Sequence, residues 1–193
     1  YPLPSGEGQS DRQMLVEDID ADGLEDIVIS DPGASEFIVY KQQSQIGLAE
    51  PVRFPSYSDV KRLVAADLDG DGGMEIAALS VEEKVIGLSF YRDGRLSFPE
   101  PIDVNGEPLA MDIADMDDDG DYDCVYIGKE AQSSTRRLEI APGIGIDGQQ
   151  GEPAVLLELE QLKSNPAGMK VMDVDNDGLN DVLIFVPYDK PLL

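Results

Sequence analysis

Short apolar runs recur along the chain, each bounded by acidic and glycine-rich stretches. The runs DIVI, EIAAL, DCVYI and DVLIFV begin at Asp26, Glu75, Asp123 and Asp181 and span only four to six residues. Three of them are rich in β-branched or aromatic residues, which is typical of buried strands. A short, partly alternating segment precedes each acidic stretch: MLVED, LVAAD, MDIAD and KVMD. The pattern therefore predicts an all-β chain made of repeated strand, acidic loop, strand units.

The spacing of these units predicts a larger repeat. The acidic loops begin at Asp18, Asp67, Asp115 and Asp173, which lie 49, 48 and 58 residues apart. A period near 50 residues with about four antiparallel strands per unit is typical of β-propeller blades, and the acidic loop would join strands 1 and 2 of each blade. We expect one propeller domain over 1–193, with blades at approximately 11–57, 58–106, 107–163 and 164–193, the last one incomplete.

The second unit shows the expected blade most clearly. Its strands are predicted at 62–66, 75–80, 84–92 and 95–104. Asp93-Gly94 lies between the last two and is a hairpin turn signal. In the third unit, residues 154–163 alternate in a way that suits an outer strand, with a short helix as the alternative. Met14, Met111, Met169 and Met172 lie in or beside the strands that lead into the loops, so we expect them to fill the core.

Each acidic loop has the same distribution of oxygen-bearing side chains over nine residues. Carboxylates occupy positions 1, 3, 5 and 9, a glycine occupies position 6, and position 7 can offer its backbone carbonyl. Ca²⁺ binds roughly six to eight oxygens, and alternation at positions 1, 3 and 5 directs three carboxylates toward one centre. The glycine permits the sharp turn that a residue with a Cβ resists. The loops therefore predict up to four calcium sites.

The candidate ligands come from all four loops, with Glu75 in place of aspartate in the second. The predicted side-chain ligands are Asp18, Asp20, Asp22, Asp26, Asp67, Asp69, Asp71, Glu75, Asp115, Asp117, Asp119, Asp123, Asp173, Asp175, Asp177 and Asp181. The predicted backbone carbonyl ligands are Leu24, Gly73, Asp121 and Leu179. An EF-hand would need a glutamate at position 12 and a helix after it. Position 12 instead lies inside each apolar run, so the loops are not EF-hands.

These loops, in their strand context, resemble the FG-GAP and VCBS repeats, which form calcium-loaded blades in integrin α-subunit propellers and in many secreted bacterial proteins. The resemblance rests on the D-x-D-x-D-G-x-x-D core and covers nearly the whole chain. The tripeptides that name the family differ, since no Phe-Gly follows the loops. Pro32-Gly33-Ala34 and Ala141-Pro142-Gly143 are only distant counterparts of Gly-Ala-Pro. The looser VCBS-like branch fits better, and integrin-type ligand binding is not carried over.

The fourth unit stops before its outer two strands, which leaves about three and a half blades. Closed propellers have roughly four to eight blades, and open sheet edges are sites for pairing with another chain. We therefore expect a piece of a larger propeller or one chain of an assembly.

The charge of the chain limits its partners. The net charge is −26, from 14 basic and 40 acidic residues. Nucleic acid and anionic membrane surfaces are poor partners for such a chain. The longest apolar stretch, VLIFV, is too short for membrane insertion. Calcium sites of this kind fill readily where calcium is millimolar, so we expect a secreted, periplasmic or cell-surface location.

Catalysis has little support in the sequence. The chain has no histidine, which removes the commonest general base. Its single cysteine, Cys124, lies in a predicted strand, where a small buried hydrophobic role is the simplest interpretation. We expect a non-catalytic module.

Three functions agree with these features. The first is a calcium-stabilised extracellular module that binds protein or glycan. The second is a non-catalytic part of a secreted carbohydrate-active enzyme, which a neighbouring catalytic segment would favour. The third is a structural subunit of a larger extracellular or periplasmic complex, completed by further propeller blades.

Overall fold

The computed structural model describes residues 11–45, 47–131, 133, 135–145, 150–187 and 190–193. Within these residues the chain forms strands β1 to β18 and no helix, so the predicted all-β class is confirmed. In the described part of the chain, no helix has the length and apolar character that a membrane span requires.

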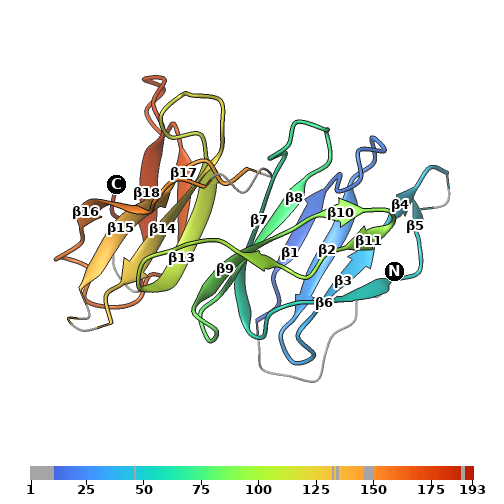
Figure 1. Cartoon of the computed structure of the whole chain (residues 1–193), viewed down its shortest axis with the longest axis horizontal. Helices are drawn as coiled ribbons and strands as arrows, with labels where there is room; N and C mark the ends of the chain where they lie inside the picture. The colour runs from blue at the N-terminus through green and yellow to red at the C-terminus, as the bar shows by residue number, and fades with distance from the viewer. Residues whose placement is uncertain (1–10, 46, 132, 134, 146–149, 188–189) are drawn as a thin grey trace.

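Three four-stranded antiparallel sheets follow one another along the chain (Figure 1). Their strand orders are β1-β2-β3-β6, β7-β8-β9-β12 and β13-β14-β15-β16, and we call them sheets 1, 2 and 3. β17 and β18 form a fourth, two-stranded antiparallel sheet, called sheet 4. Ile184 of β18 also makes an isolated antiparallel bridge with Leu192. Each larger sheet is therefore a meander that runs outward from its first strand.

The strands of sheets 1 and 2 are β1 (Met14–Glu17), β2 (Asp26–Asp31), β3 (Glu36–Tyr40), β6 (Val52–Pro55), β7 (Val60–Ala66), β8 (Glu75–Ser80), β9 (Val85–Ser89) and β12 (Glu100–Pro101). Those of sheets 3 and 4 are β13 (Glu107–Ala114), β14 (Asp123–Lys129), β15 (Arg136–Ala141), β16 (Ala154–Glu158), β17 (Gly168–Met172) and β18 (Asp181–Phe185). Two short hairpins complete the set: β4 (Gln42–Gln43) with β5 (Gly47–Leu48), and β10 (Tyr91–Arg92) with β11 (Arg95–Leu96).

The strands predicted for the second unit are present in sheet 2, with two differences. Segments 84–92 and 95–104 each divide into two short strands, so that β10 and β11 form a separate hairpin. Asp93 and Gly94 form its two-residue turn, with φ of 52° and 75°. This left-handed pair is typical of a type I′ turn and confirms the turn prediction. In sheet 3, β16 confirms the outer strand that was predicted within 154–163 and excludes the helix alternative there.

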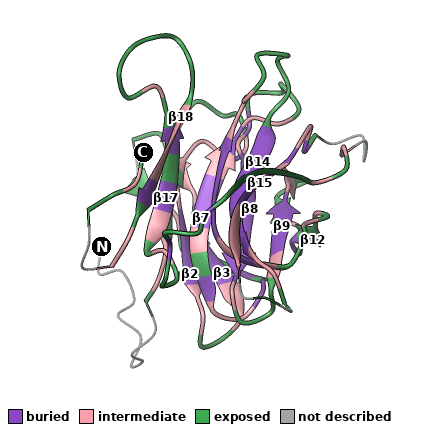
Figure 2. Cartoon of the chain, turned by 90° about the vertical axis from the view of Figure 1, so that its left-hand side faces the viewer, coloured by how far each residue is buried: buried purple, intermediate pink, exposed green. Residues whose placement is uncertain are grey.

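The sheets stack face to face in chain order, with one apolar core between each neighbouring pair. Sheets 1 and 2 enclose a core that includes Phe37 and Ile76. Sheets 2 and 3 enclose one that includes Leu79 and Tyr126, and sheets 3 and 4 enclose one around Ile127. β8 is buried at every position because both faces of sheet 2 are covered. Figure 2 shows this contrast between the buried middle strands and the exposed loop that joins β17 to β18.

The stacking order explains which methionines lie in the core. Met111 and Met169 are buried, as predicted, because each faces a neighbouring sheet. The prediction was wrong for Met14 and Met172, which are 56% and 47% exposed. They belong to the first and fourth sheets, on the sides that face away from the stack.

The first strands of the four sheets lie next to one another, and one buried carboxylate joins three of them. β1 contacts β7, β7 contacts β13 and β13 contacts β17. Asp112 of β13 is fully buried and accepts a hydrogen bond from the backbone N–H of Val171 at 2.7 Å. Its oxygens also lie 3.0 Å from the Lys170 ammonium and 3.7 Å from the Arg62 guanidinium. These contacts tie the inner strands of sheets 2, 3 and 4 together.

Candidate metal centres

The four acidic loops all lie at the same end of the stack, because each joins the first strand of a sheet to the second (Figure 1). We call them loop 1 (18–26), loop 2 (67–75), loop 3 (115–123) and loop 4 (173–181). Neighbouring loops touch in two places. The Met74 N–H in loop 2 donates to the Asp18 carbonyl at 2.9 Å, and the Asn180 side-chain amide in loop 4 donates to the Asp115 carbonyl at 2.8 Å. The loops therefore form a rim in which loop 1 is linked to loop 2 and loop 3 is linked to loop 4.

Two hydrogen bonds recur in every loop and fix its backbone. The position 1 carboxylate accepts the N–H of the glycine at position 6, at 2.8 to 3.1 Å. The position 5 carboxylate accepts the N–H of position 7, at 2.8 to 2.9 Å. Such side-chain to backbone bonds favour tight turns over regular secondary structure. The repeated aspartates therefore build the loop as well as carry its charge.

Positions 4 and 6 of each loop adopt the left-handed conformation. Position 6 has φ between 81° and 95° and is glycine in all four loops. Position 4 has φ between 56° and 71° and is Ala21, Gly70, Asp118 or Asn176. The second bend was missed at the sequence level because alanine and aspartate do not signal it as glycine does.

The loops gather their carboxylates in two ways. In loops 3 and 4, side-chain oxygens from positions 1, 3 and 9 lie within 4.8 Å of one another. In loops 1 and 2, the corresponding oxygens come from positions 1, 3 and 5. The gathered residues are Asp18, Asp20 and Asp22; Asp67, Asp69 and Asp71; Asp115, Asp117 and Asp123; and Asp173, Asp175 and Asp181. Clustered carboxylates repel one another, and an oxygen-seeking cation such as Ca²⁺ fits this donor set.

The position 9 carboxylate in loops 2, 3 and 4 accepts the backbone N–H of position 2. The bonds run from Leu68 to Glu75 at 2.8 Å, from Met116 to Asp123 at 2.9 Å, and from Val174 to Asp181 at 3.1 Å. They tie the end of each loop back to its beginning, next to the other carboxylates.

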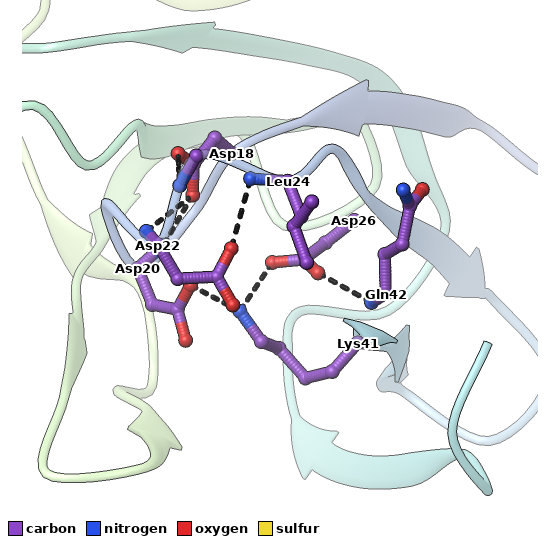
Figure 3. A network of polar contacts seen from close by, with 8 residues as sticks. Asp18, Asp20, Asp22, Leu24, Asp26, Lys41 and Gln42 are labelled. Atoms are coloured by element: carbon purple, nitrogen blue, oxygen red, sulfur yellow. Dashed lines mark hydrogen bonds and ion pairs between the residues drawn. The ribbon is translucent and has the colours of Figure 1, made fainter. Parts of the chain in front are cut away.

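Loop 1 differs, as Figure 3 shows. Asp26 accepts the Gln42 N–H at 2.7 Å and the Lys41 ammonium at 2.6 Å, and Lys41 also forms an ion pair with Asp20. Among the described residues, no hydrogen bond joins the Ile19 N–H to Asp26. Lys41 follows the apolar strand β3 directly, and no sequence motif marked it as part of the loop.

Burial raises the pKa of the carboxyl group at position 9 in loops 1 and 2. Burial raises the pKa of Glu75 to about 7, together with the charges of Asp69, Asp71 and Asp67 and against the Leu68 hydrogen bond. Burial also raises the pKa of Asp26, and the Lys41 and Gln42 hydrogen bonds oppose this rise. A buried carboxyl among other carboxylates favours its neutral form, and a nearby cation favours the charged one.

The four predicted carbonyl ligands, Leu24, Gly73, Asp121 and Leu179, lie at the turn after position 6. Each donates its N–H to the position 5 carboxylate of its own loop. Ligation by their carbonyl oxygens stays a prediction, as does ligation by the side chains.

Comparison with known families assigns part of the chain. Residues 18–78 match the family model of the FG-GAP-like repeat. The matched segment begins at the first residue of loop 1, contains loop 2, and ends within β8. The predicted resemblance is thereby confirmed for this segment, and the all-β fold is consistent with FG-GAP-type repeats. No match to the chain was found among curated proteins. Loops 3 and 4 lie outside the matched segment but have the same two recurring hydrogen bonds as loops 1 and 2.

Proposed function

We propose that this chain is a calcium-stabilised, non-catalytic module of a β-propeller, which binds or assembles with a protein or glycan outside the cell. The observation that carries the proposal is the rim of four acidic loops, built alike and hydrogen-bonded in neighbouring pairs at one end of the stack. FG-GAP repeats are typically extracellular, which supports a secreted, periplasmic or cell-surface location.

Calcium would act on stability through charge. The chain has a net charge of −26, and much of the acidic charge is concentrated in the loops. Each bound Ca²⁺ would offset two negative charges and hold the first two strands of its sheet together through one loop. Because a preformed site is lost on unfolding, calcium binding favours the folded chain.

The blades proposed are 11–57, 58–106, 107–163 and 164–193. Sheets 1 to 4 each fall within one of these segments, and their stacking in chain order supports this division. A non-catalytic role is supported by the lack of histidine and by the state of the single thiol. Cys124 is fully buried, and burial raises its pKa, so the reactive thiolate is disfavoured.

A specific observation also favours assembly with further blades. The outward faces of sheets 1 and 4 expose apolar side chains: Met14 and Val16 on β1, and Met172 and Phe185 on β17 and β18. In sheets 2 and 3 the equivalent faces are covered by a neighbouring sheet. Further propeller blades, from this protein or another chain, would cover them in the same manner.

Thermal unfolding followed by circular dichroism tests the calcium role. The chain should unfold cooperatively in millimolar calcium, at a Tm higher than in excess chelator by roughly 5–10 °C for each occupied site. Magnesium at the same concentration is the control, since it prefers a smaller, octahedral site. A Tm that is the same in calcium and in chelator would contradict the proposal.

A further inference from the structure

Loop 1 has a cation built into its surroundings, and the strand register shows why. β2 and β3 are antiparallel, and Ile27 pairs with Tyr40. Asp26, one residue before Ile27, therefore faces Lys41, one residue after Tyr40. The equivalent residue facing Asp123 of loop 3 is Pro142, since Cys124 pairs with Ala141. Of these two loops, only loop 1 has a basic side chain facing its ninth residue across the sheet.

The two loops use the same carboxylate differently. Asp123 accepts one hydrogen bond from Gly143 at 2.9 Å and one from Met116 within its loop. Asp26 accepts the corresponding bond from Gln42 at 2.7 Å, but its second oxygen binds Lys41. In loop 3 this second oxygen closes the loop by accepting the Met116 N–H, whereas the equivalent oxygen in loop 1 is paired with the Lys41 ammonium.

Lys41 is held at this place by a neighbouring sheet. Its side chain is only 19% exposed, and its ammonium lies 5.4 Å from the centre of the Tyr91 ring. Tyr91 belongs to the β10–β11 hairpin, which lies between β9 and β12 of sheet 2 along the chain. Ion pairs with Asp20 and Asp26 and the aromatic face together restrict this lysine to the loop.

We propose that the Lys41 ammonium takes the place of a calcium ion in loop 1. This inference rests on the proposed calcium role of the other loops. Lys41 occupies oxygens of positions 3 and 9 of loop 1, which the motif assigns to the ion. It also places a positive charge where a divalent cation would have to enter. Because calcium affinity depends on the charge of the ligand set, loop 1 should stay empty at calcium concentrations that fill loop 3.

Calcium titration calorimetry of the full chain tests this directly. Lys41→Met keeps the length of the side chain and removes its charge, so the variant should bind one calcium ion per chain more than the wild type. Lys41→Arg keeps the charge and should bind as the wild type does. Lys84→Met is the matched control, because Lys84 pairs with Glu107 outside the loops. Equal stoichiometry and affinity in the wild type and Lys41→Met would overturn the inference alone. A wild type that binds no calcium would overturn the proposed function and this inference together.

A second measurement uses the wild type and does not depend on a variant that folds. Lysines are acetylated with acetic anhydride, which releases acetate, in calcium sufficient to fill the other loops and in chelator. The modification of each lysine is measured by mass spectrometry. In both conditions Lys41 should be modified less than the exposed Lys84. The extent of Lys41 modification should differ by less than about twofold between calcium and chelator. A rise in Lys41 modification to the level of Lys84 on adding calcium would mean that the ion displaces the ammonium, and would overturn the inference.

Discussion

Loop 1 and loop 3 share the same two backbone hydrogen bonds but differ in their electrostatic environment. In both, the carboxylate at position 1 accepts the N–H of the glycine at position 6, and the carboxylate at position 5 accepts the N–H of position 7. Their ninth residues, Asp26 and Asp123, are both buried, but Asp26 is bound by Lys41 and Asp123 is tied back to its own loop. The acidic motif therefore determines the shape of the loop, while the residue across the sheet determines how much negative charge remains for an ion.

The largest effect should come from removing the ninth carboxylate. Asp123→Ala leaves the N–H groups of Met116 and Gly143 without an acceptor, so we expect a loss of about 3–5 kcal/mol in millimolar calcium. In chelator the loss should fall to about 2 kcal/mol, since no ion is bound there. Urea unfolding in both buffers measures the two values.

Asp26→Ala gives the matching measurement for loop 1. It should also destabilise the chain, but by the same amount in calcium and in chelator, because Lys41 and not an ion is its partner. A calcium dependence as large as that of Asp123→Ala would remove the difference between the two loops.

The next largest effect concerns the two bends within a loop. Gly120 has φ of 95° and nothing within 4 Å of where a Cβ would lie, so Gly120→Ala should cost about 1–2 kcal/mol through backbone strain alone. Gly70→Ala, at position 4 of loop 2, should cost less than about 1 kcal/mol, since Ala21 occupies that position in loop 1. Thermal unfolding of the two variants in one buffer gives the comparison, and equal costs would contradict it.

A moderate effect with a distinct pH dependence is expected for loop 2. The folded pKa of Glu75, about 7, lies above its ordinary value of 4.5, so the unfolded chain releases this proton first as pH rises. Glu75 therefore lowers stability progressively between pH 4.5 and 7 and fully above pH 7.

In chelator at pH 8, Glu75→Gln should accordingly stabilise the chain by about 1 kcal/mol, and at pH 4 it should change little. Chemical unfolding at the two pH values checks this, with Glu83→Gln, outside the loops, as the control. A gain at pH 4 equal to that at pH 8 would show that charge is not the cause.

The smallest effect is expected at the seventh position. Leu179 is 70% exposed, and its interaction within loop 4 is made by its backbone N–H. Leu179→Ser should therefore change the free energy of unfolding by less than about 0.5 kcal/mol, in calcium and in chelator alike. Urea unfolding provides the measurement, and a calcium-dependent loss would show that this side chain matters to the loop.

Much of the fold could be predicted because its signals are local. The apolar runs after Asp26, Asp123 and Asp181 became strands, and the Asp93-Gly94 turn formed where predicted. The exposure of Met14 and Met172 could not be predicted, because methionines in similar strands differ only in whether another sheet covers them. The linking role of Asp112 was also missed, since its partners Arg62 and Lys170 are 50 and 58 residues away along the chain.

The sequence alone determined the strand and loop pattern and the conformation of each acidic loop, because these depend on local residue preferences and on contacts between residues at most seven apart. Tertiary structure decided what surrounds each loop. It brought Lys41 against Asp26 across the sheet, set Tyr91 beside that lysine, and joined loop 1 to loop 2 through Met74. The charge balance of an ion site depends on every group within a few ångströms, including those that only folding brings near.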